Sequence, residues 1–172
     1  MLDKILSKEE CAACRFCCSF RRTSLYETPV IEPCLLPRLR ARYPEAKFKP
    51  VEHPAPRGTM TVDLDGLYQT GDPEEEALCW FNRNGCILGD DKPFDCRIWP
   101  LYAMRRGGRL VIALSLSCRV LAGRRSEVQK LVDDGLGRKI FDYVALHPEF
   151  VRDYREGYPV LMQQEREGEI SK

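Results

Sequence analysis

Apolar residues recur at helical spacing over residues 126–147, in the last third of the chain, and predict an amphipathic helix there. Ser126 begins a capping-box pattern at the start of this stretch, and the His-Pro pair at 147–148 predicts its end. Gly135 and Gly137 weaken the helix locally, because glycine loses more conformational freedom than other residues on folding. The apolar positions of this stripe are Val128, Leu131, Val132, Leu136, Ile140, Tyr143 and Val144.

Alternation of apolar and polar residues predicts strands earlier in the chain. The segment Thr59–Thr70 predicts a β-hairpin, because its alternating positions surround Asp65-Gly66, a two-residue turn signal. The segment Arg109–Ser117 predicts an apolar strand that follows a turn at the glycine pair 107–108.

Prolines and polar runs predict short helices and loops in the remaining segments. Residues 1–10 predict a short polar helix or a frayed lead-in, and Pro37–Tyr43 predicts one or two helical turns that a proline stops. Residues 44–58 predict a loop, because they are rich in proline. After the helix that ends at 147, we expect a short helix to Tyr154 and then a polar, loose tail from Gly157.

Charge and hydropathy narrow the range of functions. The chain has 172 residues, a net charge of +1 and a pI of about 7.5, which gives no electrostatic argument for nucleic acid or an anionic membrane. Charged residues between Asp3 and Glu10 leave no apolar run typical of a signal peptide, and the longest uncharged apolar run, Leu110–Cys118, is too short to span a bilayer. We therefore expect a cytoplasmic protein with neither nucleic-acid nor membrane partners.

The chain contains nine cysteines, and without an export signal this number favours metal or redox chemistry over disulfides. The odd count and the adjacent pair Cys17-Cys18 also argue against a disulfide framework. The only histidines are His53 and His147, so a metal site here would be rich in sulfur.

The densest cysteine cluster is the stretch Cys11-Ala-Ala-Cys14-Arg-Phe-Cys17-Cys18. Thiolates packed this closely repel one another and oxidise easily, whereas a soft metal centre binds the thiolate form and stabilises it. The repeat at Cys11, Cys14 and Cys17 places three sulfurs within reach of one centre, as in runs that hold iron–sulfur clusters. The fourth ligand must then come from elsewhere in the chain. Because adjacent side chains point in different directions, Cys17 and Cys18 favour two centres, or one centre and a thiol outside it.

The later cysteines are more widely spaced. The turn signal Asn82–Gly85 lies between Cys79 and Cys86 and would bring these two thiols near each other across a short ribbon. Cys96 follows Pro93, which rigidifies the approach of the chain, so that Cys96 would enter a site with less entropy to lose.

The early stretch, together with the spaced later cysteines and Pro-x-x-Cys-Arg at 93–97, resembles the CxxCxxCC family, the YkgJ-type cysteine-cluster proteins described as zinc- or iron-chelating domains. The resemblance covers about residues 11–118. Arg15 stands where the family usually has glycine, so a turn that needs a positive φ would be strained there. Cys34 has no place in the pattern, and we expect it to be a small buried core residue. The resemblance implies eight metal ligands: Cys11, Cys14, Cys17, Cys18, Cys79, Cys86, Cys96 and Cys118.

The identity of the metal stays open at this point. Structural zinc sites usually pair two short Cys-x-x-Cys knuckles, and only the first half of this chain supplies one. The widely spaced later cysteines suit single ligands to a cluster. We therefore expect as cofactor an iron–sulfur cluster, of the 4Fe-4S type, or zinc.

Arg97 directly follows Cys96 and has two interpretations. Its guanidinium would neutralise the excess negative charge of a thiolate cluster or donate hydrogen bonds to sulfur, which makes it a candidate cofactor-binding residue. Alternatively, it is a surface arginine paired with Asp90, Asp91 or Asp95. The aromatic residues near the late cysteines favour a dry shell around a metal over a platform for stacking bases. They are Trp80, Phe81, Phe94, Trp99 and Tyr102.

Together these features predict an α+β fold, a small loop-rich, metal-stabilised domain with short β-hairpins and C-terminal helices packed on it. Residues 1–122 would form the cysteine-cluster metal-binding domain, and residues 123–172 a helical extension packed on the same domain. The main function hypothesis is a metal-binding protein with an accessory, structural or electron-transfer role. An alternative is a cluster-dependent protein-modifying enzyme, because flagellin lysine-N-methylases are similar to this family across the cysteine region. A third is an interaction module whose helices dock a protein partner. No catalytic residue is apparent from the sequence.

Overall fold

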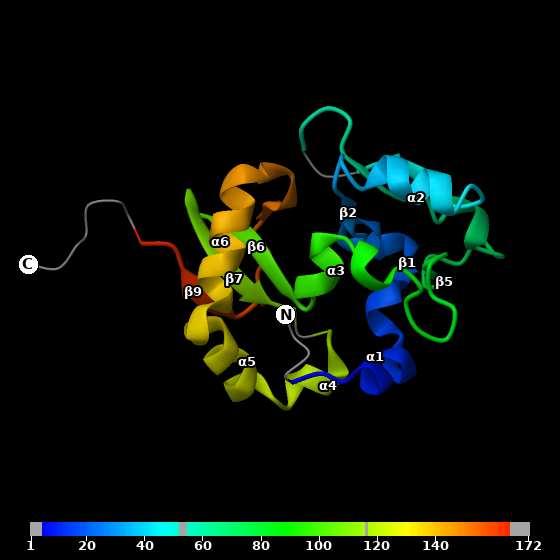
Figure 1. Cartoon of the computed structure of the whole chain (residues 1–172). Helices are drawn as coiled ribbons and strands as arrows, with labels where there is room; N and C mark the ends of the chain where they lie inside the picture. Colours follow the sequence, from blue (N-terminus) through cyan, green and yellow to red (C-terminus); the bar gives the residue numbers. More distant parts are fainter. Residues whose placement is uncertain (1–4, 52–54, 116, 166–172) are drawn as a thin grey trace, which may run out of the picture.

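The computed structural model describes residues 5–51, 55–115 and 117–165 (Figure 1). It combines helices with three small sheets, so the predicted α+β class is confirmed. The helices are α1 (Lys8–Cys14), α2 (Leu36–Arg42), α3 (Phe94–Ile98), α4 (Arg119–Ala122), α5 (Arg125–Leu131) and α6 (Gly137–Leu146). The strands are β1 (Ser19–Arg21), β2 (Val30–Ile31), β3 (Phe48–Pro50), β4 (Met60–Val62), β5 (Glu76–Leu78), β6 (Leu101–Arg106), β7 (Arg109–Leu114), β8 (Arg152–Asp153) and β9 (Val160–Gln163).

A four-stranded sheet in the order β8-β6-β7-β9 forms one half of the molecule, which we call the sheet half together with α5 and α6. The predicted glycine turn is confirmed, since Gly107 and Gly108 have φ of 56° and 79° and join β6 to β7 in a hairpin. The two strands alternate between faces: Leu101 and Ala103 belong to the core under the helices, whereas Tyr102 and Met104 pack on the opposite face. Figure 1 shows α6 lying along the sheet.

The predicted loose tail is wrong. From Val160 the chain forms β9, which pairs antiparallel with β7 and buries Leu161 in the core. The predicted short helix before it is limited to a 3-10 turn, Pro148–Phe150, after which β8 pairs parallel with β6. These strands are too short for a period-two pattern to be visible in the sequence.

The helix predicted over 126–147 is present in two parts. Between α5 and α6 lies a π turn (Val132–Leu136), in which Gly135 takes φ of 108°, a value that glycine reaches without strain. The end at His147 is confirmed, but the predicted capping box is wrong, because α5 begins at Arg125 and its N-cap residue makes no side-chain cap bond. The apolar stripe is buried: Val128, Val132, Leu136, Ile140 and Val144 all lie in one core cluster.

Gly137 differs from Gly135, because its backbone is helical, with φ of −57°. A Cβ at this position would collide with the Sδ atom of Met162 on β9 and would lie 3.0 Å from Cγ1 of Val132. Gly137 therefore lets β9 approach the helix closely and does not act as a hinge.

The second half, which we call the cysteine half, spans residues 15–91 and has its own core and two small sheets, β1-β5 and β2-β4-β3. The hairpin predicted over Thr59–Thr70 is wrong. Only β4 forms there; β2 and β3 pair with its two edges, and Asp65–Leu67 is a 3-10 turn. The chain continues past this turn because Leu64 and Tyr68 are buried in the core of the cysteine half.

The two halves meet at α3, whose Phe94 and Ile98 lie in the same core cluster as the stripe of α5 and α6. The predicted boundary between residues 1–122 and 123–172 stays a prediction. Among the described residues, no helix combines the length and the apolar character needed to cross a membrane.

Candidate metal centre

The pairing of β1 with β5 brings Cys18 next to Cys79. Ser19 is paired with Leu78, so the two cysteines lie side by side at the end of the ladder. The N–H of Cys79 donates to the carbonyl oxygen of Cys18 at 2.6 Å. An early and a late cysteine of the sequence pattern therefore share one short ribbon.

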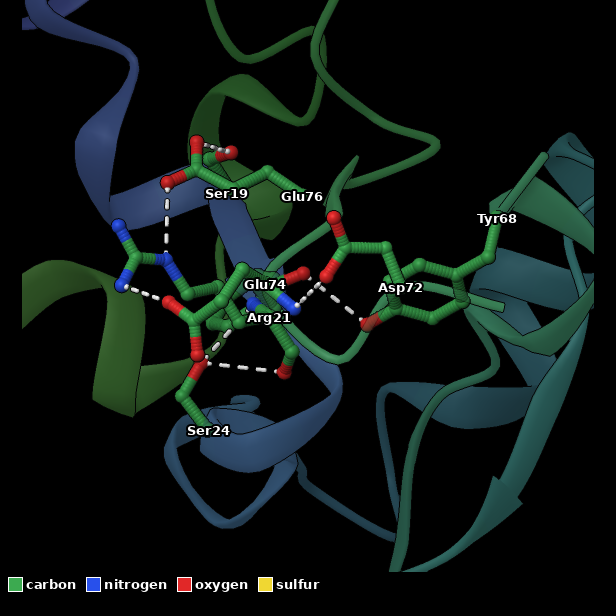
Figure 2. A network of polar contacts seen from close by, with 8 residues as sticks. Ser19, Arg21, Ser24, Tyr68, Asp72, Glu74 and Glu76 are labelled. Atoms are coloured by element: carbon green, nitrogen blue, oxygen red, sulfur yellow. Dashed lines mark hydrogen bonds and ion pairs between the residues drawn. The ribbon is translucent and has the colours of Figure 1, made fainter. Parts of the chain in front are cut away.

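A network of polar side chains fixes this register (Figure 2). Arg21 donates to Glu74 at 2.7 Å and to Glu76 at 3.3 Å, and the Ser19 hydroxyl donates to Glu76 at 2.8 Å. The Tyr68 hydroxyl is buried and donates to a main-chain carbonyl of β1 at 3.0 Å. A slip of one residue would break these contacts and separate the cysteines, so the network supports the site.

Cys86 is positioned by the turn predicted at Asn82–Gly85. Asn82 and Cys86 form an isolated antiparallel bridge, and both Asn84 (φ 59°) and Gly85 (φ 118°) are left-handed. The turn thus returns the chain toward Cys79, as the sequence predicts.

The expected strain at Arg15 is present. Arg15 has φ of 52°, in the left-handed region, and its Nη2 atom donates to Oδ1 of Asn84 at 3.0 Å. A hydrogen bond therefore links two non-glycine residues in left-handed conformation, one after α1 and one in the turn before Cys86. Such conformations persist where surrounding contacts fix them, and they are concentrated at functional sites.

Cys96 lies in α3, and four thiols meet near it. Burial raises the pKa of the Cys79 thiol to about 12, and the neighbouring Cys18 and Cys86 act in the same direction. Burial likewise raises the pKa of Cys96 well above its ordinary value, and the thiols of Cys18, Cys79 and Cys86 add to the effect. Cys18, Cys79, Cys86 and Cys96 thus lie near one another around one cavity, and we call these four residues the thiol cluster. A fifth thiol adjoins it, because the Sγ atom of Cys17 lies 3.7 Å from that of Cys18.

The thiol cluster lines a cavity of about 1100 Å³. Cys17 also lines it, and so do Arg97 and Tyr102. Within the described part of the chain, no three Cys, His, Asp or Glu side chains already stand close enough to hold a metal ion. The thiols therefore line the cavity without being close enough to share a metal ion, and binding one would require them to move closer.

The other predicted ligands lie elsewhere or outside the described side chains. Cys14 ends α1 and is partly exposed, while Cys118 is buried in the core of the sheet half beside α4. Cys11 lies in α1, but its side chain is outside the described part. The early Cys-x-x-Cys is therefore helical, and the tight turn comes one residue later, at Arg15. The helix begins with a capping box that sequence reasoning missed, in which Ser7 and Glu10 bond reciprocally.

The expectation that Cys34 is a buried core residue is wrong, because Cys34 is exposed. It lies in the turn before α2, where Leu35 and Leu39 are the residues buried in the core. The turn after Pro33 orients Cys34 toward solvent.

The carboxylate that the structure places beside Arg97 is none of the three aspartates expected from the sequence. The Nη2 atom of Arg97 lies 3.5 Å from Oε1 of Glu32, a buried carboxylate that sequence reasoning missed. The predicted partners are bound elsewhere: Asp91 pairs with Arg38 and Arg42, and Asp95 pairs with Arg152. Arg97 lines the cavity, so its role toward a cofactor stays a prediction.

The predicted aromatic shell is divided between cores. Trp80 and Phe81 pack with Cys79 and Cys86, whereas Phe94 belongs to the sheet-half core and Tyr102 to the opposite face of its sheet. The apolar shell around the thiol cluster therefore consists of residues from both halves. The hydroxyl of Tyr102 is buried and, among the described residues, finds no hydrogen-bond partner.

Glu32, Asp95 and Arg152 form polar contacts around helix α3, which carries Cys96. Glu32 carries a weak sequence signal, since it is a charge directly after the apolar pair Val30-Ile31. Arg152 carries none, because its neighbours show no motif and it comes from the far end of the chain.

In comparisons with family models, curated proteins and solved structures, nothing matches this chain.

Proposed function

We propose that this protein binds a metal centre through the thiol cluster and serves an accessory role, structural or in electron transfer. The observation that carries the proposal is that Cys18, Cys79, Cys86 and Cys96, which come from separate segments of the chain, line one cavity. Random burial of cysteines as small hydrophobes does not favour four thiols at one cavity.

The chemistry of this donor set fits a soft metal. The thiols of Cys79 and Cys96, whose pKa values are raised by burial, do not ionise on their own near neutral pH. A bound cation supplies the missing positive charge, so that the thiols lose their protons and become ligands. Sulfur donors suit zinc or an iron–sulfur cluster. When bound, such a group would supply either a structural link or a one-electron carrier.

The remaining predicted ligands raise the question of a second metal centre. Cys17 adjoins Cys18, while Cys14 and Cys118 belong to α1 and to the start of α4, two helices that contact each other. We propose that these cysteines, with Cys11, serve a second centre if the protein carries two. A single centre would use the thiol cluster alone.

Purification without oxygen, followed by metal analysis, sulfide determination and an absorption spectrum, tests the proposal. We expect iron with acid-labile sulfide, or zinc, at one or two centres per chain. A folded, colourless, metal-free protein that takes up neither zinc nor iron and sulfide would contradict it.

A second candidate function is a cluster-dependent protein-modifying enzyme that resembles flagellin lysine-N-methylases. The cavity of about 1100 Å³ beside the thiols favours this candidate, because ligand pockets have volumes of this order. Mass spectrometry of protein lysines in cells with and without this protein tests it. Identical modification in the two samples would leave the accessory role as the function.

A further inference from the structure

Helix α3 is tied to strand β2 by two crossed hydrogen bonds. The carboxylate of Glu32 accepts from the N–H of Phe94, the first residue of α3, at 2.8 Å. The carboxylate of Asp95 accepts from the N–H of Val30 at 3.0 Å. Because each segment supplies one side chain and one main-chain donor, the position of α3 relative to β2 is fixed on both sides. Cys96 is the next residue after Asp95.

Arg152 on β8 reaches this arrangement from the other half of the molecule. Its Nη2 atom donates to Oδ2 of Asp95 at 2.6 Å and to the carbonyl oxygen of Thr28 at 3.2 Å. Its Nη1 atom donates to the carbonyl oxygen of Tyr26. The side chains of Arg152 and Asp95 are each only 7% exposed, so this is a buried ion pair with several supporting hydrogen bonds.

The charge of Arg152 matters for the neighbouring thiol. A buried carboxylate without a partner is strongly unfavourable, and removal of one member of a buried pair leaves the other uncompensated. Without Arg152, the negative charge of Asp95 would stand unopposed beside Cys96, where thiolates must form when metal binds. The chain would relieve this by moving Asp95 toward water, and α3 would move with it.

We propose that Arg152 is a positioning residue of the metal centre: through its ion pair with Asp95 it holds α3, and with it Cys96, at the thiol cluster. This inference rests on the proposed function. It adds the edge strand β8, near the end of the chain, to the segments that build the site. It also explains physically why an aspartate precedes the cysteine in Asp95-Cys96, since that carboxylate is the link between strand, helix and arginine.

Co²⁺ titration of the full-length metal-free protein under anaerobic conditions tests the inference, with the thiolate-to-cobalt absorption band as readout. We expect Arg152→Met to bind Co²⁺ at least ten-fold more weakly and with an altered band. The double variant Arg152→Met/Asp95→Asn should recover most of the affinity, because an amide still accepts from Val30 and carries no charge. Arg152→Lys should retain more affinity than Arg152→Met, because an ammonium group still opposes the charge of Asp95.

Leu161→Ala is the matched control. It removes apolar packing of β9 from the sheet-half core, and the Leu161 side chain makes no hydrogen bond or ion pair to α3. It should lower the unfolding midpoint and leave the cobalt band unchanged. If Arg152→Met binds Co²⁺ as tightly as the wild type and with the same band, the inference is overturned. It is equally overturned if Arg152→Met does not fold and the folded double variant still binds Co²⁺ at least ten-fold more weakly than Leu161→Ala does. If the wild type itself binds neither Co²⁺ nor zinc nor iron, the proposed function has failed, and this inference fails with it.

Discussion

The sheet half and the cysteine half of this molecule are stabilised in different ways. In the sheet half, strands β6 and β7 are six residues long each, and the helices above them bury an unbroken apolar stripe. In the cysteine half the strands have two or three residues, and much of the chain lies in 3-10 turns. Regular periodic burial supports the first half, whereas the second combines an apolar core with short strands, polar contacts and an aromatic group.

The aromatic group of the cysteine half illustrates this. Phe81 contacts Tyr43 and Trp80, with its ring centroid 5.4 Å and 5.3 Å from theirs, and Cys79 packs in the same core. Short strands around such a group bury little surface by themselves. A metal that links several segments of this half would therefore contribute directly to its folding free energy. In this molecule, aliphatic packing would stabilise mainly the sheet half, and metal binding would add to the stability of the cysteine half.

The largest effect is expected from breaking the thiol cluster. Cys79→Ser should abolish stoichiometric metal at the thiol cluster, because the hydroxyl does not replace a buried thiolate ligand. Cys34→Ser is the matched control and should keep the metal, since Cys34 is exposed and away from the cavity. Metal analysis of the two variants decides the matter, and the reverse ranking would contradict the proposed site. Loss of half the metal from Cys118→Ser would indicate two centres.

A large loss of stability, but not of metal, is expected from a cavity in the sheet half. Ile140 is completely buried, so Ile140→Ala should lower the free energy of unfolding by about 2–5 kcal/mol. Leu146→Ala, at a residue 80% exposed, should change it by less than about 0.5 kcal/mol. Denaturant titration measures both. A loss of metal from the folded Ile140→Ala protein would mean that packing in the sheet half also determines metal binding at the thiol cluster.

The thiol cluster predicts a pH effect in the metal-free protein. The pKa of Cys79 rises from an ordinary 9.0 to about 12 on folding, and that of Cys96 rises in the same direction. Above pH 9 the unfolded chain therefore releases protons that the folded chain keeps, so the free energy of unfolding falls by about 1.4 kcal/mol per pH unit for each shifted thiol. Urea titrations between pH 8 and 11 test this. Stability that rises over this range would show that the thiols ionise in the fold.

The smallest effects are expected in the polar network of Figure 2. Tyr68→Phe should cost about 1–2 kcal/mol, because it leaves a carbonyl of β1 without its buried donor. Arg21→Ala should cost less than about 1 kcal/mol, because its ion pairs with Glu74 and Glu76 are exposed. Thermal unfolding of both variants in one buffer gives the comparison. If Arg21→Ala costs as much as Tyr68→Phe or more, the exposed ion pairs contribute more than expected to the pairing of β1 with β5.

The sequence predicts the sheet half better than the cysteine half, for physical reasons. The stripe ending at Val144, the turn at Gly107 and the strand from Arg109 were found because repeated burial leaves a period in the sequence. Strands β8 and β9 were missed because they are too short to show one. The false hairpin after Met60 came from a true local turn signal, which the burial of Tyr68 overrides.

The candidate site shows the same limit. The spacing of Cys79 and Cys86 around a turn was enough to predict their approach, because the connection between them is local. That Cys18 and Cys96 join them depends on sheet pairing and on α3, which no local pattern records. Glu32 and Arg152 make their contacts with segments that are distant in the sequence, so at most a weak local signal indicates a role for either residue.

The contact between Gly137 and Met162 has a consequence for how this sequence can change over time. A Cβ at Gly137 would collide with the Sδ atom of Met162 and would lie 3.0 Å from Cγ1 of Val132, so a side chain there requires the Met162 side chain to shift. Shortening Met162 first would remove the closest of these contacts, and the change at Gly137 would then need less rearrangement. The two positions should therefore show epistasis, with Gly137→Ala harmful alone and tolerated beside Met162→Ala.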